Sequence, residues 1–134
     1  MHYKIALIGF GNVARSLARL LVRKQELLKS QYDVTFSFTG IATGSHGFAV
    51  NPNGLDIQKA LELVESKQSI APLSTVDVKN SLDVINHSSA DVMFENSPVN
   101  TQTGQPAVGH IRNAFELNMH AITANKGPIV HGYR

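Results

Sequence analysis

The feature that most constrains the fold of this chain is a glycine motif near its start. A short apolar run over residues 3–8 stops at Gly9, and the motif Gly9-x-Gly11-x-x-Ala14 opens a stretch with apolar residues at helical spacing. Gly9 permits a tight turn, Gly11 lets the backbone approach a ligand, and the small Ala14 lets the helix pack closely on the strand. The unpaired N–H groups at the start of such a helix suit a diphosphate. In this context the motif predicts dinucleotide binding, with a purely structural tight turn as the alternative.

Beyond the motif, predicted strands and helices alternate along the chain. Strands are expected over residues 3–8, 33–43, 91–95 and 121–124, and loops over 44–54 and 96–105. Helices are expected from the glycine motif to about residue 29 and over 55–66, 76–87 and 106–120. Such alternation favours parallel pairing through right-handed crossovers. We therefore predict an α/β fold, a Rossmann-type, doubly wound and mostly parallel sheet with helices on both faces. A chain of 134 residues has room for one such domain, over residues 1–134.

Composition excludes several other classes of protein. The chain has no cysteine, which excludes a disulfide framework, a thiolate zinc site and a thiol nucleophile within it. Its six histidines show no i, i+4 pair, so we predict no metal site. A net charge of +2 without a basic stripe argues against nucleic acid. No apolar run approaches the roughly 20 residues of a membrane span, and no signal peptide is recognisable, so we expect no membrane association and a cytoplasmic location.

The end of the second predicted strand bears on the choice of cofactor. An acidic residue at this place usually binds the adenosine ribose, but the sequence Thr43-Gly-Ser-His46 has none. A 2′-phosphate is therefore admissible, although no Arg or Lys between residues 34 and 58 is available to bind it. Ser45, His46 and Arg15 are candidates for that role, with ordinary loop or solvated-helix positions as the alternative. We take Thr43 as a cofactor-binding position and leave both NADP and NAD open.

Two polar segments follow later predicted strands. They are Glu-Asn-Ser-Pro-Val-Asn over residues 95–100 and Ala-Asn-Lys-Gly-Pro over residues 124–128. Open α/β sheets place their ligands at the carboxyl ends of parallel strands, where both segments fall. A lysine there, Lys126, could polarise a carbonyl or exchange a proton with an alkoxide during hydride transfer. The alternative is a surface lysine in a turn.

Three segments of the chain together resemble the nucleotide-binding domain of homoserine dehydrogenase. They are residues 5–14 (IALIGFGNVA), 97–107 (SPVNTQTGQPA) and 122–128 (ITANKGP), and the similarity runs in order through essentially the whole chain. The resemblance implies a reversible, NAD(P)-dependent interconversion of L-homoserine and L-aspartate 4-semialdehyde, in the route to threonine and methionine.

The resemblance also implies roles for individual residues. Along the dinucleotide phosphates it places Phe10, Gly11, Asn12 and Val13. Beside the nicotinamide ribose it places Ser97, Pro98 and Asn125, and beside the reacting carbon it places Lys126, the active-site lysine of the family. Two departures stand out: Ser97 occupies a position where threonine is common, and the second strand lacks the arginine often found in NADP-preferring members.

The family has a further domain that this sequence does not contain. That domain supplies the carboxylates that bind homoserine, a second catalytic lysine and much of the dimer interface, and none of these follows Arg134. We therefore expect the cofactor domain of a longer, homodimeric enzyme, which alone binds nucleotide without turning over homoserine. The alternatives are a non-catalytic NAD(P)-sensing module and the cofactor domain of another semialdehyde dehydrogenase, whose chemistry needs a cysteine thiolate.

Overall fold

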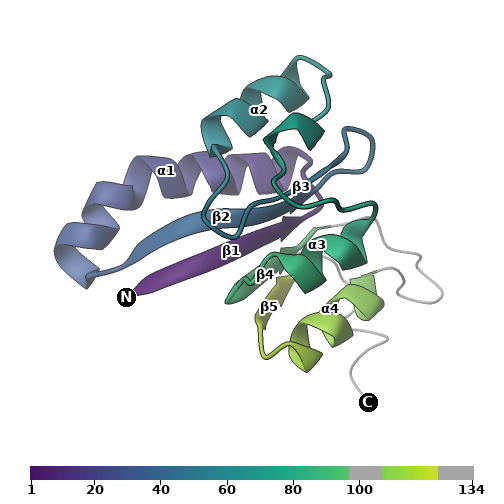
Figure 1. Cartoon of the computed structure of the whole chain (residues 1–134). Coiled ribbons are helices and arrows are strands. Elements are labelled where there is room, and N and C mark those ends of the chain that lie inside the picture. Colours follow the sequence, from purple (N-terminus) through teal and green to yellow (C-terminus); the bar gives the residue numbers. More distant parts are fainter. Residues whose placement is uncertain (97–106, 124–134) are drawn as a thin grey trace.

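The protein folds into a mostly parallel sheet with helices on both faces (Figure 1). The structure is a computed structural model and describes residues 1–96 and 107–123. The described strands are β1 (His2–Ile8), β2 (Thr35–Ala42), β3 (Phe48–Val50), β4 (Val92–Glu95) and β5 (His120–Thr123). The described helices are α1 (Asn12–Tyr32), α2 (Ile57–Glu65), the 3-10 turn η1 (Ala71–Leu73), α3 (Ser81–His87) and α4 (Ala107–Glu116). The strand order is β3-β2-β1-β4-β5, and only β3 pairs antiparallel. The predicted α/β, doubly wound class is confirmed.

Each face of the sheet carries its own hydrophobic core. Along β1, Ile5 and Leu7 pack into a cluster with residues of α1 and α2, whereas Ala6 and Ile8 pack into a second cluster with residues of α3 and α4. Figure 1 shows α1 and α2 on one side of the strands and α3 and α4 on the other. A strand buried on both faces reads as a continuous apolar run, which is why the sequence pattern identified β1.

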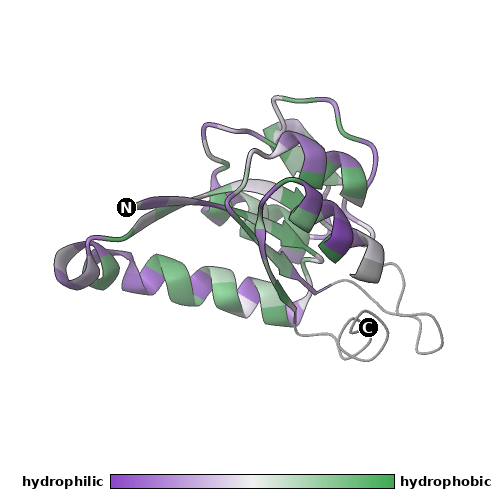
Figure 2. Ribbon diagram, turned by 90° about the horizontal axis from the view of Figure 1, so that it is seen from below, coloured by the Kyte–Doolittle hydropathy of each residue, from purple (hydrophilic) through white to green (hydrophobic). Residues whose placement is uncertain are grey.

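Helix α1 is the longest element and has one face on the sheet. Its buried residues are Ala14 and Ala18, and hydrophilic and hydrophobic residues alternate along it in Figure 2. The helix ends at Tyr32, three residues later than predicted, and Asp33 terminates it in the left-handed conformation with φ +53°. Arg19, an exposed residue of α1, forms an ion pair with Glu65 of α2, so the two helices also contact each other outside the core.

The prediction of a loop over residues 44–54 is wrong, because β3 lies within it. Phe48–Val50 pairs with Gly40–Ala42 of β2 to form a hairpin. Gly47 takes a φ of +83° in the connecting turn, and its carbonyl accepts a hydrogen bond from the N–H of Thr43 (3.1 Å). A strand of three residues is too short to show alternation, so the surrounding glycines and asparagines dominated the sequence pattern.

Two helix boundaries also differ from prediction. Helix α3 begins at Ser81 rather than residue 76, because the side chain of Asn80 caps it by accepting a hydrogen bond from the N–H of Asp83 (2.8 Å). Helix α4 ends at Glu116 rather than His120, because the chain turns at Asn118 with φ +60° and His120 already begins β5. The predicted loop over 96–105 lies outside the described residues except for Asn96.

The close approach of α3 to β2 at Gly40 gives a test of this packing. A Cβ at Gly40 would lie 2.9 Å from Cβ of Ser88 and 2.9 Å from Cγ1 of Val84, both fully buried residues. We expect Gly40→Ala to lower the free energy of unfolding by about 1–3 kcal/mol through overpacking, as measured by urea denaturation. The control is Gly44→Ala, where a Cβ meets nothing within 4 Å. Equal stability of the two variants would contradict the described α3 packing.

Candidate functional site

The carboxyl ends of the parallel strands lie in one row at one edge of the sheet. Ile8 of β1 pairs with Ala42 of β2 on one side and with Glu95 of β4 on the other, and Glu95 pairs with Thr123 of β5. The chain runs from β1 to one side of the sheet and later crosses to the other side, so the strand order reverses between β1 and β4. Open α/β sheets bind their ligands at such a switch point.

The chain turns sharply at this edge after β1. Gly9 has a φ of +91°, a conformation that favours glycine, and its N–H donates to the carbonyl of Ala42 (2.8 Å). On the other side, the carbonyl of Ile8 accepts a hydrogen bond from the N–H of Asn96 (2.7 Å). The predicted tight turn at Gly9 is confirmed, and these two bonds extend the sheet ladder into the segments that follow β1 and β4.

Gly11 occupies the cap position of α1 with an ordinary backbone conformation. Its φ is −82° and ψ −161°, and a Cβ built on it would meet nothing within 4 Å. Neither backbone strain nor crowding therefore requires glycine here. No side chain caps the helix, and its first turn carries no acidic residue. Within the described part of the chain, nothing therefore crowds the start of the helix at Gly11, and its positive end suits an anion.

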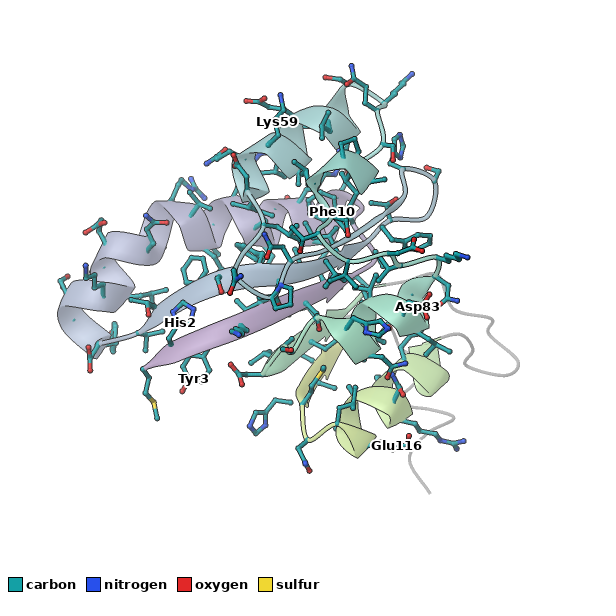
Figure 3. All side chains as sticks on the ribbon, in the orientation of Figure 1. His2, Tyr3, Phe10, Lys59, Asp83 and Glu116 are labelled. Carbon is teal, nitrogen blue, oxygen red and sulfur yellow. The ribbon has the colours of Figure 1, made fainter. Side chains whose placement is uncertain are left out.

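The side chains of the remaining motif residues divide between core and surface. Phe10 and Ala14 are buried in the cluster between the sheet and α1 and α2, where Figure 3 labels Phe10. A ligand at the helix start can therefore contact only the backbone of Phe10. Asn12 and Val13, in contrast, are exposed at the start of the helix.

A cation also lies in the first turn of α1. Nη2 of Arg15 donates to Oδ1 of Asn12 (2.7 Å), and its Nε is buried without a hydrogen-bond partner among the described residues. A positive charge at a helix N-terminus is unfavourable by itself, because the helix dipole has the same sign there. An anion bound in front of the turn would compensate both charges.

The end of β2 forms a closed loop around Thr43. Its hydroxyl accepts a hydrogen bond from the N–H of His46 (2.7 Å) and donates to the carbonyl of Gly47 (2.7 Å). This hydroxyl is thus used within the loop, while the exposed Ser45 lies with its Oγ 2.9 Å from Nδ1 of His46. The loop presents hydroxyl and imidazole groups to a ligand, and no carboxylate.

Sequence reasoning missed a buried polar pair at the end of β4. A hydrogen bond of 2.6 Å joins Nδ1 of His110 on α4 to Oε2 of Glu95, and the side chains are 7% and 0% exposed. Two features could have indicated it: Glu95 ends an apolar strand, and His110 precedes the buried Ala114 by one helical turn. The predicted site residues Ser97, Pro98, Asn125 and Lys126 lie outside the described residues.

Among the described residues, no group of three or more His, Asp or Glu side chains could hold a metal ion. Within the same part of the chain, no helix has the length and apolar character to cross a membrane.

Comparison with known sequences identifies relatives along the whole chain, although no protein-family model matches it. A homoserine dehydrogenase from Methanocaldococcus jannaschii is 37% identical over 131 residues. A protein from Pseudomonas canavaninivorans, named NAD(+)-dependent homoserine dehydrogenase, is 38% identical over 133 residues. Each alignment covers 97% of this chain but 38% of the relative, so the chain spans well under half the length of these proteins.

Solved structures share the fold. The homoserine dehydrogenase of Thermoplasma acidophilum has a TM-score of 0.79 at 22% identity, over 100% of this chain and 38% of its own. A putative homoserine dehydrogenase of Archaeoglobus fulgidus has a TM-score of 0.75 at 29% identity, and the match covers 96% of this chain and 36% of that one. A hyperthermophilic archaeal homoserine dehydrogenase mutant, solved in complex with NADPH, has a TM-score of 0.77 at 22% identity. The match covers 99% of this chain and 39% of that one.

The two glycines of the motif should differ in what they contribute to stability. Gly9→Ser forces a side chain into a φ of +91°, and we expect it to lower the free energy of unfolding by about 1–2 kcal/mol. Gly11→Ser meets open space and introduces a favourable helix cap, so the free energy of unfolding should fall by no more than about 0.5 kcal/mol. Urea denaturation measures both. A larger loss for Gly11→Ser than for Gly9→Ser would refute this assignment.

Proposed function

This chain is homologous to the homoserine dehydrogenases over 97% of its length, and we propose that it is the NAD(P)-binding domain of such an enzyme. The enzyme would interconvert L-homoserine and L-aspartate 4-semialdehyde, and this domain, residues 1–134, would hold the dinucleotide. Independent support comes from the strand ends, which place the glycine turn at the switch point of a doubly wound sheet.

The open space at Gly11 is the observation that carries the proposal. The positive φ at position 9 favours glycine, and the buried position 14 favours a small residue. Nothing in the described chain requires a glycine at position 11. A ligand that approaches the backbone there would require it. We infer that the cofactor diphosphate lies against the N–H groups at the start of α1, along the backbone of Phe10 and Gly11 and beside Asn12 and Val13.

The adenosine half of the cofactor would extend toward the end of β2. Thr43 would contribute by shaping the loop, since its hydroxyl is bonded within it, and the side chains of Ser45 and His46, which are hydrogen-bonded to each other, would face the ribose. This loop has neither the acid that favours NAD nor an arginine that binds a 2′-phosphate. We therefore propose NAD or NADP. The Pseudomonas relative is named NAD(+)-dependent, and one archaeal relative was solved with NADPH.

The nicotinamide half would lie on the β4 and β5 side of the switch point. We propose Ser97, Pro98 and Asn125 beside its ribose, because the segments that contain them follow Glu95 and Thr123 in the row of strand ends. The cofactor supplies hydride transfer when bound. Lys126 would exchange a proton with the substrate oxygen, so that oxidation of the alcohol sends hydride to the nicotinamide and the hydroxyl proton to the lysine.

Substrate binding and turnover would need more protein than this chain. Because the chain spans 38% of its curated relatives, we assign to it nucleotide binding, and to the longer enzyme the reaction and assembly as a homodimer. A cytoplasmic location, and the absence of nucleic-acid and membrane partners, stay predictions from composition.

Calorimetric titration of the chain with NAD⁺, NADH, NADP⁺ and NADPH tests the proposal. We expect NAD⁺ and NADH, or NADP⁺ and NADPH, to bind. Gly11→Val should raise the Kd of the cofactor that binds by about tenfold or more, because the valine side chain would separate the diphosphate from the helix N–H groups. Lys59→Ala serves as the control, since this exposed residue of α2 lies outside the proposed cofactor site. Binding by none of the four at millimolar concentration, or an unchanged Kd for Gly11→Val, would count against the site.

Lys126 must be tested in the longer enzyme. Loss of a general acid–base lysine typically costs about 10²–10⁴-fold in turnover, so Lys126→Ala should lower kcat by that order while the cofactor Kd changes little. Lys59→Ala, an exposed position on α2, is the matched control. Steady-state kinetics with homoserine and equilibrium binding of the cofactor measure the two effects. A kcat equal to that of the Lys59→Ala variant would exclude a catalytic lysine.

A further inference from the structure

The buried pair of Glu95 and His110 is the most unusual polar contact in the described interior. The carboxylate of Glu95 is completely buried, on the same face of the sheet as Ile8 and Met93, and His110 is 6% exposed. Withdrawing an ionisable side chain from water is costly, and replacing such a pair by apolar residues is often neutral or stabilising. Stability alone therefore gives a weak reason for this contact.

The position of the pair suggests a more specific role. Glu95 is the last residue of β4 and lies between Ile8 and Thr123 in the row of strand ends. His110 is in the first half of α4. The hydrogen bond therefore joins the end of β4 to the start of α4, across 15 residues of the chain. The next residue after Glu95, Asn96, donates to the carbonyl of Ile8 directly before the glycine turn.

We propose that Glu95 and His110 are positioning residues for the nicotinamide half of the cofactor. A hydrogen bond is directional, unlike an apolar contact, so it fixes the position of α4 relative to the end of β4, beside the switch point. The end of β2, which would hold the adenosine, lies across β1 from β4, and the glycine turn that would hold the diphosphate follows β1 itself, so neither contains the pair. This inference rests on the proposed function.

Two ligands separate the two halves of the site. ADP contains only the adenosine and diphosphate portions, whereas NADH adds the nicotinamide ribose and ring. The ratio of their Kd values therefore reports the nicotinamide half. A pair that served only to hold the fold together would change both Kd values together or neither of them.

The experiment uses the 134-residue chain, with ADP measured by calorimetry and NADH by its fluorescence. We expect His110→Leu to raise the Kd of NADH by about tenfold or more and to leave that of ADP within about twofold. His110→Asn places an amide nitrogen near the position of Nδ1 and should restore most of the affinity for NADH. Asn113→Ala is the matched control, because it removes a hydrogen bond between α4 and Asn86 of α3 (3.0 Å), away from the strand ends.

Each result decides between the alternatives. A parallel change of both Kd values, no change, or an equal effect of Asn113→Ala overturns the positioning role. Equal Kd values for ADP and NADH in the unmodified chain also overturn it and leave the proposed function intact. If the unmodified chain binds neither ligand, the same measurements are made with 2′-phosphorylated ADP and NADPH, and the proposed function fails first only if these do not bind either.

A second variant keeps the test valid if His110→Leu does not fold. In Glu95→Gln/His110→Leu the buried carboxylate is replaced by a neutral amide of the same shape, so loss of the imidazole leaves no buried charge. Circular dichroism and thermal unfolding confirm the fold before titration. The same selective loss of NADH affinity is expected, and an unchanged ratio of Kd values overturns the inference.

Discussion

The paired row of Ala42, Ile8, Glu95 and Thr123 is the constraint on which the rest of the structure depends. Parallel pairing brings the carboxyl ends of these strands to one edge, so segments far apart in the sequence emerge side by side there. The register is held by burial on both faces, because a slip of one residue would exchange the side chains of the two cores. The glycine turn and the chain after β4 therefore have fixed starting points.

The glycine motif shows how three small residues serve three physical purposes. Gly9 adopts a positive φ, Ala14 leaves room for the helix to approach the sheet, and Gly11 keeps the helix start open. At Gly11 alone, nothing in the described fold requires the residue to be glycine. This division explains why a substitution at Gly9 should act on stability and one at Gly11 on binding.

Polar groups near the strand ends are arranged differently on the two sides of β1. Toward β2, the hydroxyl of Thr43 is satisfied inside its own loop, and no Asp, Glu, Lys or Arg occurs between Asp33 and Asp56. Toward β4, the carboxylate of Glu95 is buried and bonded to His110. A cofactor bound across β1 would thus meet an adaptable loop at one end and a rigid attachment at the other.

The sequence by itself determined the elements whose evidence is local. The apolar run of β1, the helical spacing of α1 and α2 and the glycine turn were predictable, because burial and backbone conformation act on neighbouring residues. Only the tertiary structure decided the short strand β3, the early end of α4 and the pair of Glu95 and His110. These depend on partners distant in the chain: β3 is stabilised by pairing with β2, and Glu95 meets His110 only because α4 packs back onto the sheet.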